Sequence, residues 1–157
     1  ILKRLSGATS SMKPLKVACS MLFVMLALPS LAREMVVTAQ QVNGTWNSRF
    51  GEFQVWALGQ QRLQVAFNGV YEYRMSDGSP MANMGRANGI ALIKGDTATF
   101  KPQSDADCEL VMRFVSKTLR VSTRGSYLAC GFGHNVTADG VYQKTNSKKP
   151  KFEKNNL

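Results

Sequence analysis

Short runs in which apolar and polar residues alternate, separated by glycine, asparagine and aspartate, constrain this chain more than any other feature. The run 62–67 places Leu, Val and Phe at every second position, and the run 108–115 does the same with Cys, Leu, Met and Phe. A period of two puts alternate side chains on opposite faces of a strand. Repeated over the chain, the pattern predicts an all-β protein of about eight short antiparallel strands.

We expect the strands to close into a small antiparallel barrel of lipocalin-like type, because closure removes the exposed edges of a sheet. A two-sheet β-sandwich is the alternative. Gly44 and Trp46 resemble the Gly-x-Trp that opens the first strand of lipocalin-like barrels, although an ordinary buried Trp near a turn fits equally well. Trp46, Phe67, Phe100 and Phe114 are expected inside, either packed into a solid core or lining a hollow.

Several local signals accompany this pattern. Asn68-Gly69 predicts a hairpin turn, and 76–80 predicts the end of the short strand that Tyr71 and Tyr73 mark. The Gly-rich stretch 83–88 predicts either a loop or a sharply bent strand that another part of the backbone approaches closely. The last strands are expected at 127–130 and 136–142, and no convincing amphipathic helix interrupts the series.

Residues 12–32 have the features of a secretory signal peptide. Lys13 and Lys16 give a positive start, and an apolar run at 17–28 follows. Twelve helical residues cover roughly 18 Å, which is too short for the hydrocarbon core of a bilayer. We therefore predict cleavage before Arg33 and no transmembrane anchor in the processed protein, which would be periplasmic or secreted.

The rest of the chain is divided into three parts. Residues 1–11 are interpreted as an upstream extension, 33–144 as one β-barrel domain and 145–157 as a basic flexible tail. The whole chain carries +10. Four basic residues and no acidic residue precede the predicted cleavage site, so the processed chain carries +6, of which the last fourteen residues, 144–157, contribute +4. No basic patch is interleaved with aromatic residues, so nucleic acid is not an expected partner.

Two cysteines remain after the predicted cleavage, Cys108 and Cys130, and an even number suits an oxidising compartment. We predict that they form a disulfide that stabilises the fold by roughly 3 kcal/mol. A metal or redox pair is less favoured, because there is no Cys-x-x-Cys and His134 is the only histidine. No metal and no cofactor are therefore expected.

The sequence offers little for catalysis. Neither Gly-x-Ser-x-Gly nor a paired-histidine motif is present, and His134 has no recognisable partner. Asp105, Asp107 and Glu109 are spaced by two and would point the same way on a strand, where they could bind a hard cation. A solvated turn is the simpler interpretation. We expect no catalytic residues and no enzymatic activity.

The segment 108–144 resembles the closing half of small exported bacterial domains that occur beside lysozyme-inhibitor-like sequences. The resemblance is carried by Cys108-Glu109-Leu110 and the strand to Val121, by Cys130-Gly131-Phe132-Gly133-His134-Asn135-Val136, and by Gly140-Val141-Tyr142-Gln143-Lys144. It implies a bridged cysteine pair, a Gly-rich turn and a final tyrosine-bearing strand.

A second segment is similar to the periplasmic or membrane-bound inhibitors of c-type lysozyme. Gly85-Arg86, followed by Lys94-Gly95-Asp96-Thr97-Ala98, stands where that family has its inhibitory loop and a Lys-Gly-x-x-Ala strand. Met84 and Leu92 replace polar and aromatic residues of the family, and a positive chain would be repelled by a basic lysozyme. The resemblance implies a partner-binding surface, whose candidate residues are Asn83, Gly85, Arg86, Asn88 and Lys94.

Three functions follow for testing. The first is an exported, non-enzymatic binding protein of the cell envelope, lysozyme-inhibitor-like, whose partner is a lysozyme or a cell-wall glycan. Arg86 and Lys94 would suit an acidic cleft or an anionic glycan. The second is a lipocalin-like carrier of a small apolar ligand. The third, least favoured, is an enzyme acting on envelope polysaccharide.

Overall fold

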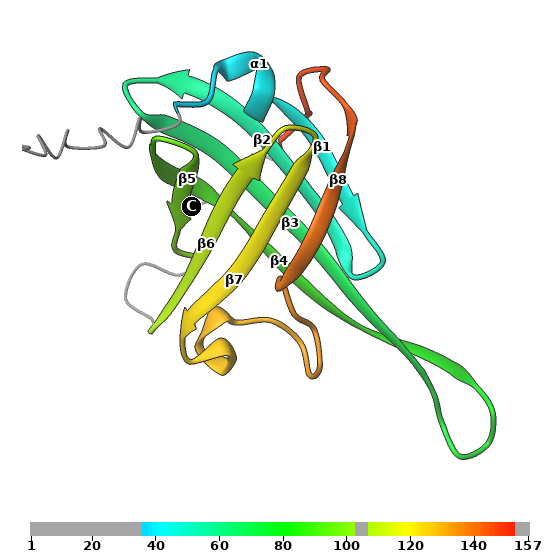
Figure 1. The fold of residues 1–157 in the computed structure, drawn as a ribbon. Coiled ribbons are helices and arrows are strands. Elements are labelled where there is room, and N and C mark those ends of the chain that lie inside the picture. Colours follow the sequence, from blue (N-terminus) through cyan, green and yellow to red (C-terminus); the bar gives the residue numbers. More distant parts are fainter. Residues whose placement is uncertain (1–35, 103–106, 153–157) are drawn as a thin grey trace, which may run out of the picture. The chain divides into compact units, whose positions relative to one another are not determined.

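The computed structural model describes residues 36–102 and 107–152. They form a closed barrel of eight antiparallel strands in chain order, with the last strand pairing to the first (Figure 1). The strands are β1 (Gly44–Ser48), β2 (Gly51–Gly59), β3 (Arg62–Arg74), β4 (Pro80–Lys94), β5 (Thr97–Phe100), β6 (Cys108–Val115), β7 (Thr118–Gly125) and β8 (Gly140–Asn146). The predicted barrel is confirmed, and the sandwich alternative is wrong.

The interior is a packed core. Side chains from every second strand position point inward and are buried, as the alternating pattern predicts. The Trp46 and Phe114 ring centroids lie 5.5 Å apart, and those of Phe53 and Phe67 lie 4.7 Å apart. Trp46, Phe67, Phe100 and Phe114 are each at most 1% exposed. These four aromatic side chains fill the barrel and do not line a hollow.

One short helix was not expected from the sequence. Helix α1 (Ala39–Val42) begins with a capping box in which Thr38 and Gln41 bond each other's backbone N–H. Two other elements hold the helix in place. The Nε1 of Trp46 on β1 donates to the Val42 carbonyl at 3.0 Å, and the Nζ of Lys144 on β8 donates to carbonyls of the helix, 2.7 Å from the Gln40 oxygen. These contacts fix α1 over one end of the barrel.

The hairpin turn predicted at Asn68-Gly69 is wrong, because both residues lie in the middle of β3. Gly51, Gly69 and Gly85 are cross-strand neighbours on β2, β3 and β4. A Cβ atom at Gly69 or Gly85 would lie 2.8 Å from a methyl group of Val136. The glycines therefore make room for a segment packed against this end of the barrel, and β3 continues to the turn at 76–79.

The segment after β7 also differs from the prediction. Residues 127–130 form a 3-10 helix, η1 (Tyr127–Cys130), which ends at Gly131 in the left-handed conformation, with φ 75°. No strand occupies 136–139, and β8 begins at Gly140. The last strand continues two residues beyond the predicted domain end at 144. After it, the ammonium of Lys149 lies 5.6 Å from the centre of the Trp56 ring on β2.

Cys108 and Cys130 form a disulfide, as predicted, with Cα atoms 5.0 Å apart. Both side chains are buried. The bond joins the start of β6 to the end of η1 and so anchors the segment that leads to Val136. A disulfide of this kind is favoured by an oxidising compartment.

The predicted extension 1–11, the signal peptide 12–32 and Arg33 lie outside the described residues, as do Asp105 and 153–157. Within the described part of the chain, none of the helices has the length and apolar character needed to cross a bilayer.

Candidate functional site

The structure places the five candidate binding residues on one strand, β4. The loop predicted at 83–88 is wrong, and the alternative of a strand closely approached by another backbone is confirmed. Alternation divides the five residues between two faces. Asn83 and Gly85 face the side that continues the barrel interior, whereas Arg86, Asn88 and Lys94 face outward.

Asn83 and Gly85 contact the segment 131–136. The Asn83 side-chain amide donates to the His134 carbonyl at 2.8 Å, and the Gly133 N–H donates to the Met84 carbonyl at 3.1 Å. Gly85 is buried beneath Val136. Both residues therefore hold that segment against the strand. His134 takes part through its backbone oxygen, and its side chain is exposed.

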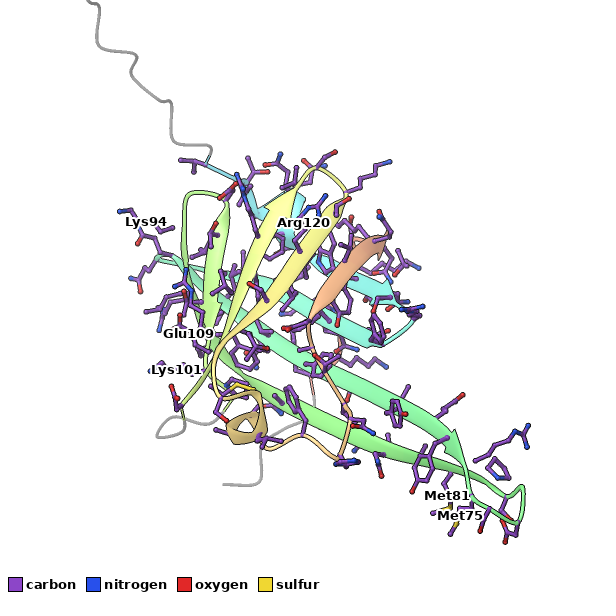
Figure 2. All side chains as sticks on the ribbon, turned by 60° about the horizontal axis from the view of Figure 1, so that its bottom comes forward. Met75, Met81, Lys94, Lys101, Glu109 and Arg120 are labelled. Atoms are coloured by element: carbon purple, nitrogen blue, oxygen red, sulfur yellow. A yellow bond between two sulfur atoms is a disulfide. The ribbon has the colours of Figure 1, made fainter. Side chains whose placement is uncertain are left out.

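Lys94 lies apart from Arg86 and Asn88. Eight strand residues separate Lys94 from Arg86, which corresponds to about 27 Å. Lys94 is at the β4–β5 turn, opposite Thr97, at the far end of β4 from Met81 (Figure 2). The five candidates therefore do not form a single site.

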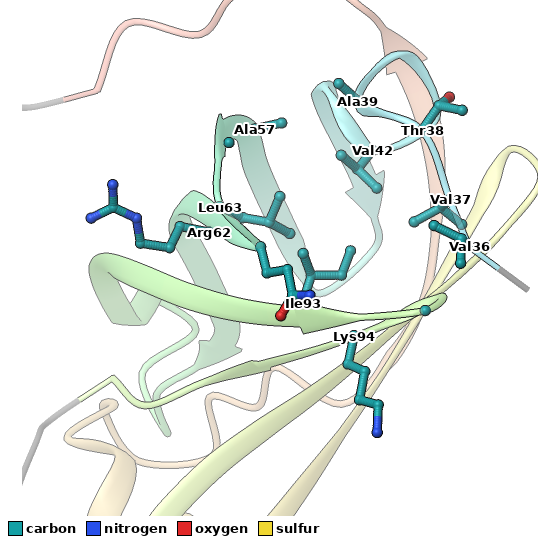
Figure 3. Close-up of a pocket in the computed structure, with 13 residues that line it drawn as sticks. Val36, Val37, Thr38, Ala39, Val42, Ala57, Arg62, Leu63, Ile93 and Lys94 are labelled. Carbon is teal, nitrogen blue, oxygen red and sulfur yellow. The ribbon is translucent and has the colours of Figure 1, made fainter. Parts of the chain in front are cut away.

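Lys94 instead borders a pocket of about 400 Å³ at the end of the barrel covered by α1 (Figure 3). Its walls are mainly apolar: Val36, Val37, Ala39, Val42, Ala57, Leu63 and Ile93. In Figure 3 the charged ends of Arg62 and Lys94 point away from these apolar side chains. The Val37 N–H donates to the Gly95 carbonyl at 3.2 Å and closes one side. This mouth pocket suits a small apolar group.

A group of exposed apolar side chains lies elsewhere. Beyond Val70, whose N–H donates to the Phe50 carbonyl at 3.2 Å, β3 pairs only with β4, and the two strands continue away from the barrel as a two-stranded ribbon (Figure 1). We name residues 70–84 the distal ribbon. Six of its apolar side chains are at least 37% exposed: Val70, Tyr71, Tyr73, Met75, Met81 and Met84.

These side chains are divided between the two faces of the distal ribbon. Tyr71 and Tyr73 stack with ring centroids 6.1 Å apart, and Met81 lies opposite Tyr73 in the strand pairing. Val70 and Met84 oppose each other on the other face. Figure 2 shows Met75 and Met81 together near the tip. This surface was not predicted from the sequence, because a turn was expected at Asn68-Gly69 and a loop at 83–88.

The tip of the distal ribbon is internally bonded. The Met75 N–H donates to the Ser79 carbonyl at 3.0 Å, and the Arg74 guanidinium donates to the Gly78 carbonyl at 3.0 Å. The Ser79 N–H donates to the Asp77 carboxylate and lowers its pKa. These bonds give the tip a defined conformation.

Acidic groups do not gather into a site in the described residues. Glu109 is paired with Arg124 at 3.4 Å across β6 and β7, and the Asp107 carbonyl accepts from the Ser126 N–H. Across 36–102 and 107–152, no three His, Cys, Asp or Glu side chains are grouped so as to hold a metal ion.

Comparison with known proteins identifies no family for this chain. No family model, no curated protein and no solved structure matches this chain.

Proposed function

We propose that this protein is an exported, non-enzymatic binding protein of the cell envelope, and that its partner is a lysozyme held by the distal ribbon. The observation that carries the proposal is the set of exposed tyrosine, methionine and valine side chains on this ribbon. The signal peptide predicted at 12–32 and the disulfide both support export.

The distal ribbon is an unfavourable surface for a protein without a partner. Asn83 and Met84 at its base are bonded to the segment 131–136, but a two-stranded ribbon that continues without such packing is marginally stable in water. Contiguous exposed apolar surface marks interaction sites, and tyrosine is enriched among the residues that dominate binding energy. The stack of Tyr71 on Tyr73, with Met81 opposite, forms an aromatic anchor of this kind.

The shape and charge of the ribbon suit the cleft of an enzyme. Its two strands end in the internally bonded tip, so it can enter a groove as a wedge. The ribbon contains Glu72 and Asp77 against the single base Arg74, a net charge of −1, whereas the processed chain carries +6. The ribbon itself would therefore not be repelled by a basic lysozyme.

The test uses the full chain, several lysozyme classes and two variants. Tyr73→Ser with Met81→Ser removes one opposed pair from the ribbon. Val141→Ser is the control, because Val141 is 47% exposed on β8, away from the ribbon. Binding is measured by calorimetry and inhibition by the clearing of a bacterial suspension.

We expect at least one lysozyme class to bind and to be slowed. The ribbon variant should weaken binding roughly tenfold or more, the range of an interface hot spot, while the control binds like the wild type. Thermal unfolding of each variant confirms that the barrel is intact. The proposal is wrong if no lysozyme class binds, or if both variants bind as the wild type does.

The mouth pocket favours a second candidate, a carrier of a small apolar ligand. Its volume of about 400 Å³ falls in the range of small-molecule sites, and its walls are apolar. Ala57→Phe would fill part of the pocket. A neutral fluorescent probe, N-phenyl-1-naphthylamine, should brighten with the wild type and less with the variant. Equal brightening, or none with either protein, would exclude this site.

A further inference from the structure

A polar groove lies on the outside of the barrel, away from the distal ribbon and the mouth pocket. Cross-strand neighbours on β2, β3 and β4 lie beneath and beside it. They form two rows: Glu52, Asn68 and Arg86 in one, of which Asn68 and Arg86 line the groove, and Gln54, Ala66 and Asn88 in the other, all of which line it. Along each strand these positions alternate with those that point into the barrel, so their side chains are on the outer face, where Ala66 is 9% exposed.

The groove exists because of one small residue. Ala66 lies between Gln54 and Asn88 in its row, and its small methyl group leaves a depression between these two longer side chains. Adjacent strands are about 4.8 Å apart, so β2 and β4, which carry the amides of Gln54 and Asn88, are separated by about 10 Å. The hollow has a volume of about 320 Å³, and Pro102 and Lys151 complete its wall.

The polar side chains around the hollow are positively charged or carry amides. Neither Arg86 nor Lys151 forms an ion pair with a described residue, and the amides of Asn68 and Asn88 form no side-chain hydrogen bond there. Each amide can both donate and accept, as a sugar hydroxyl does. The Arg86 guanidinium presents the planar set of donors that matches a carboxylate.

Two other parts of the molecule lie next to the groove: the acidic residue Glu52 and the chain after β8. Glu52 accepts a hydrogen bond from the Gln54 side chain at 2.8 Å and does not line the hollow. The contact between Lys149 and the ring of Trp56 holds the chain after β8 over β2 and brings Lys151 to the groove. Basic residues that the sequence analysis assigned to a flexible tail are therefore part of this surface.

We propose that this groove binds an acidic saccharide. Arg86 pairs with the carboxylate of the sugar, Lys151 adds a second positive charge, and Asn68 and Asn88 bond the hydroxyl and amide groups. The groove is separate from the distal ribbon. This site therefore goes beyond the proposed lysozyme binding and can be tested independently of it.

The test is calorimetric titration of the full chain with three probes. The first is the disaccharide of N-acetylglucosamine and N-acetylmuramic acid, which carries a carboxylate. The second is chitobiose, a matched neutral disaccharide. Sodium lactate is the third and supplies a carboxylate without a sugar. We expect the acidic disaccharide to bind about tenfold or more tightly than either other probe, the effect of one charge-assisted bond.

Variants locate the site. Arg86→Gln should weaken binding of the acidic disaccharide about tenfold, and Ala66→Leu, which fills the hollow, should abolish it. Arg120→Gln is the matched control, because Arg120 is exposed on β7 (Figure 2), and it should bind like the wild type. The double variant at Tyr73 and Met81 should also bind the saccharide normally, which separates this result from the lysozyme assay.

The proposal is overturned if the acidic disaccharide does not bind or if chitobiose binds as tightly. It is equally overturned if lactate alone binds as tightly, which would indicate a simple anion site, or if Arg120→Gln causes the same loss as Arg86→Gln.

Discussion

Removing the disulfide should cost a calculable part of the stability. The bond between Cys108 and Cys130 closes a loop with a sequence separation of 22 residues. Loop closure of this length restricts the unfolded chain and is worth about 3.4 kcal/mol at 25 °C in the chain-entropy model. Cys108→Ala with Cys130→Ala should lower the free energy of unfolding by about this amount.

Urea denaturation followed by tryptophan fluorescence measures the loss. With a urea dependence of about 1 to 3 kcal/mol per molar, the midpoint should fall by roughly 1 to 3 M. Wild type reduced with a phosphine should resemble the alanine variant, since both lack the constraint. A difference in unfolding free energy below about 1 kcal/mol between oxidised wild type and the variant would refute the loop-closure reasoning.

Three smaller perturbations test other parts of the fold. A Cβ atom at Gly133 would lie 2.7 Å from the Met84 carbonyl oxygen, so Gly133→Ala should cost about 1–3 kcal/mol in urea denaturation, and an unchanged midpoint would contradict this packing. Burial raises the pKa of Tyr142 to about 12. The contribution of its neutral phenol to the free energy of unfolding is therefore complete below pH 10 and is lost as the pH rises toward 12. Wild type should lose up to about 2.7 kcal/mol more than Tyr142→Phe over that range, and parallel curves would contradict this. The Arg113 guanidinium lowers the pKa of Asp96, so Asp96→Asn should cost less than about 1 kcal/mol at pH 7, and this difference should vanish as the pH falls below 3.8; a larger cost or a pH-independent one would count against the ion pair.

The sequence predicted the barrel because its main determinants are local. Alternation along runs such as 108–115 specifies which face of each strand is buried, and an even number of cysteines specifies a bond. Helix α1 also had a local signal that the analysis overlooked, the capping box from Thr38 to Gln41.

The distal ribbon was missed because its determinants are distant in the chain. Gly69 and Gly85 normally indicate turns, but here they accommodate Val136, which is more than fifty residues further along. Asn83 has a loop-forming side chain, yet its amide bonds the His134 carbonyl. No local pattern predicts contacts of this kind, so a strand that continues through glycine was interpreted as a turn and a loop.

The groove on the outer face was not predicted. Arg86 and Asn88 were candidate binding residues from the resemblance to lysozyme inhibitors and were expected on a loop, whereas the structure places both on strand β4, where they line the groove. Lys151 and Ala66 were not recognised, because their proximity to Arg86 depends on strand register and on the path of the chain after β8.

Hydrogen exchange of the full chain, measured with and without a lysozyme that binds it, tests the central claim most directly. A two-stranded ribbon with exposed backbone should exchange quickly in the free protein. The account predicts that lysozyme slows exchange at 70–84 and leaves β6 and β7 unchanged. Protection elsewhere on the barrel, with 70–84 still exchanging quickly, would contradict it.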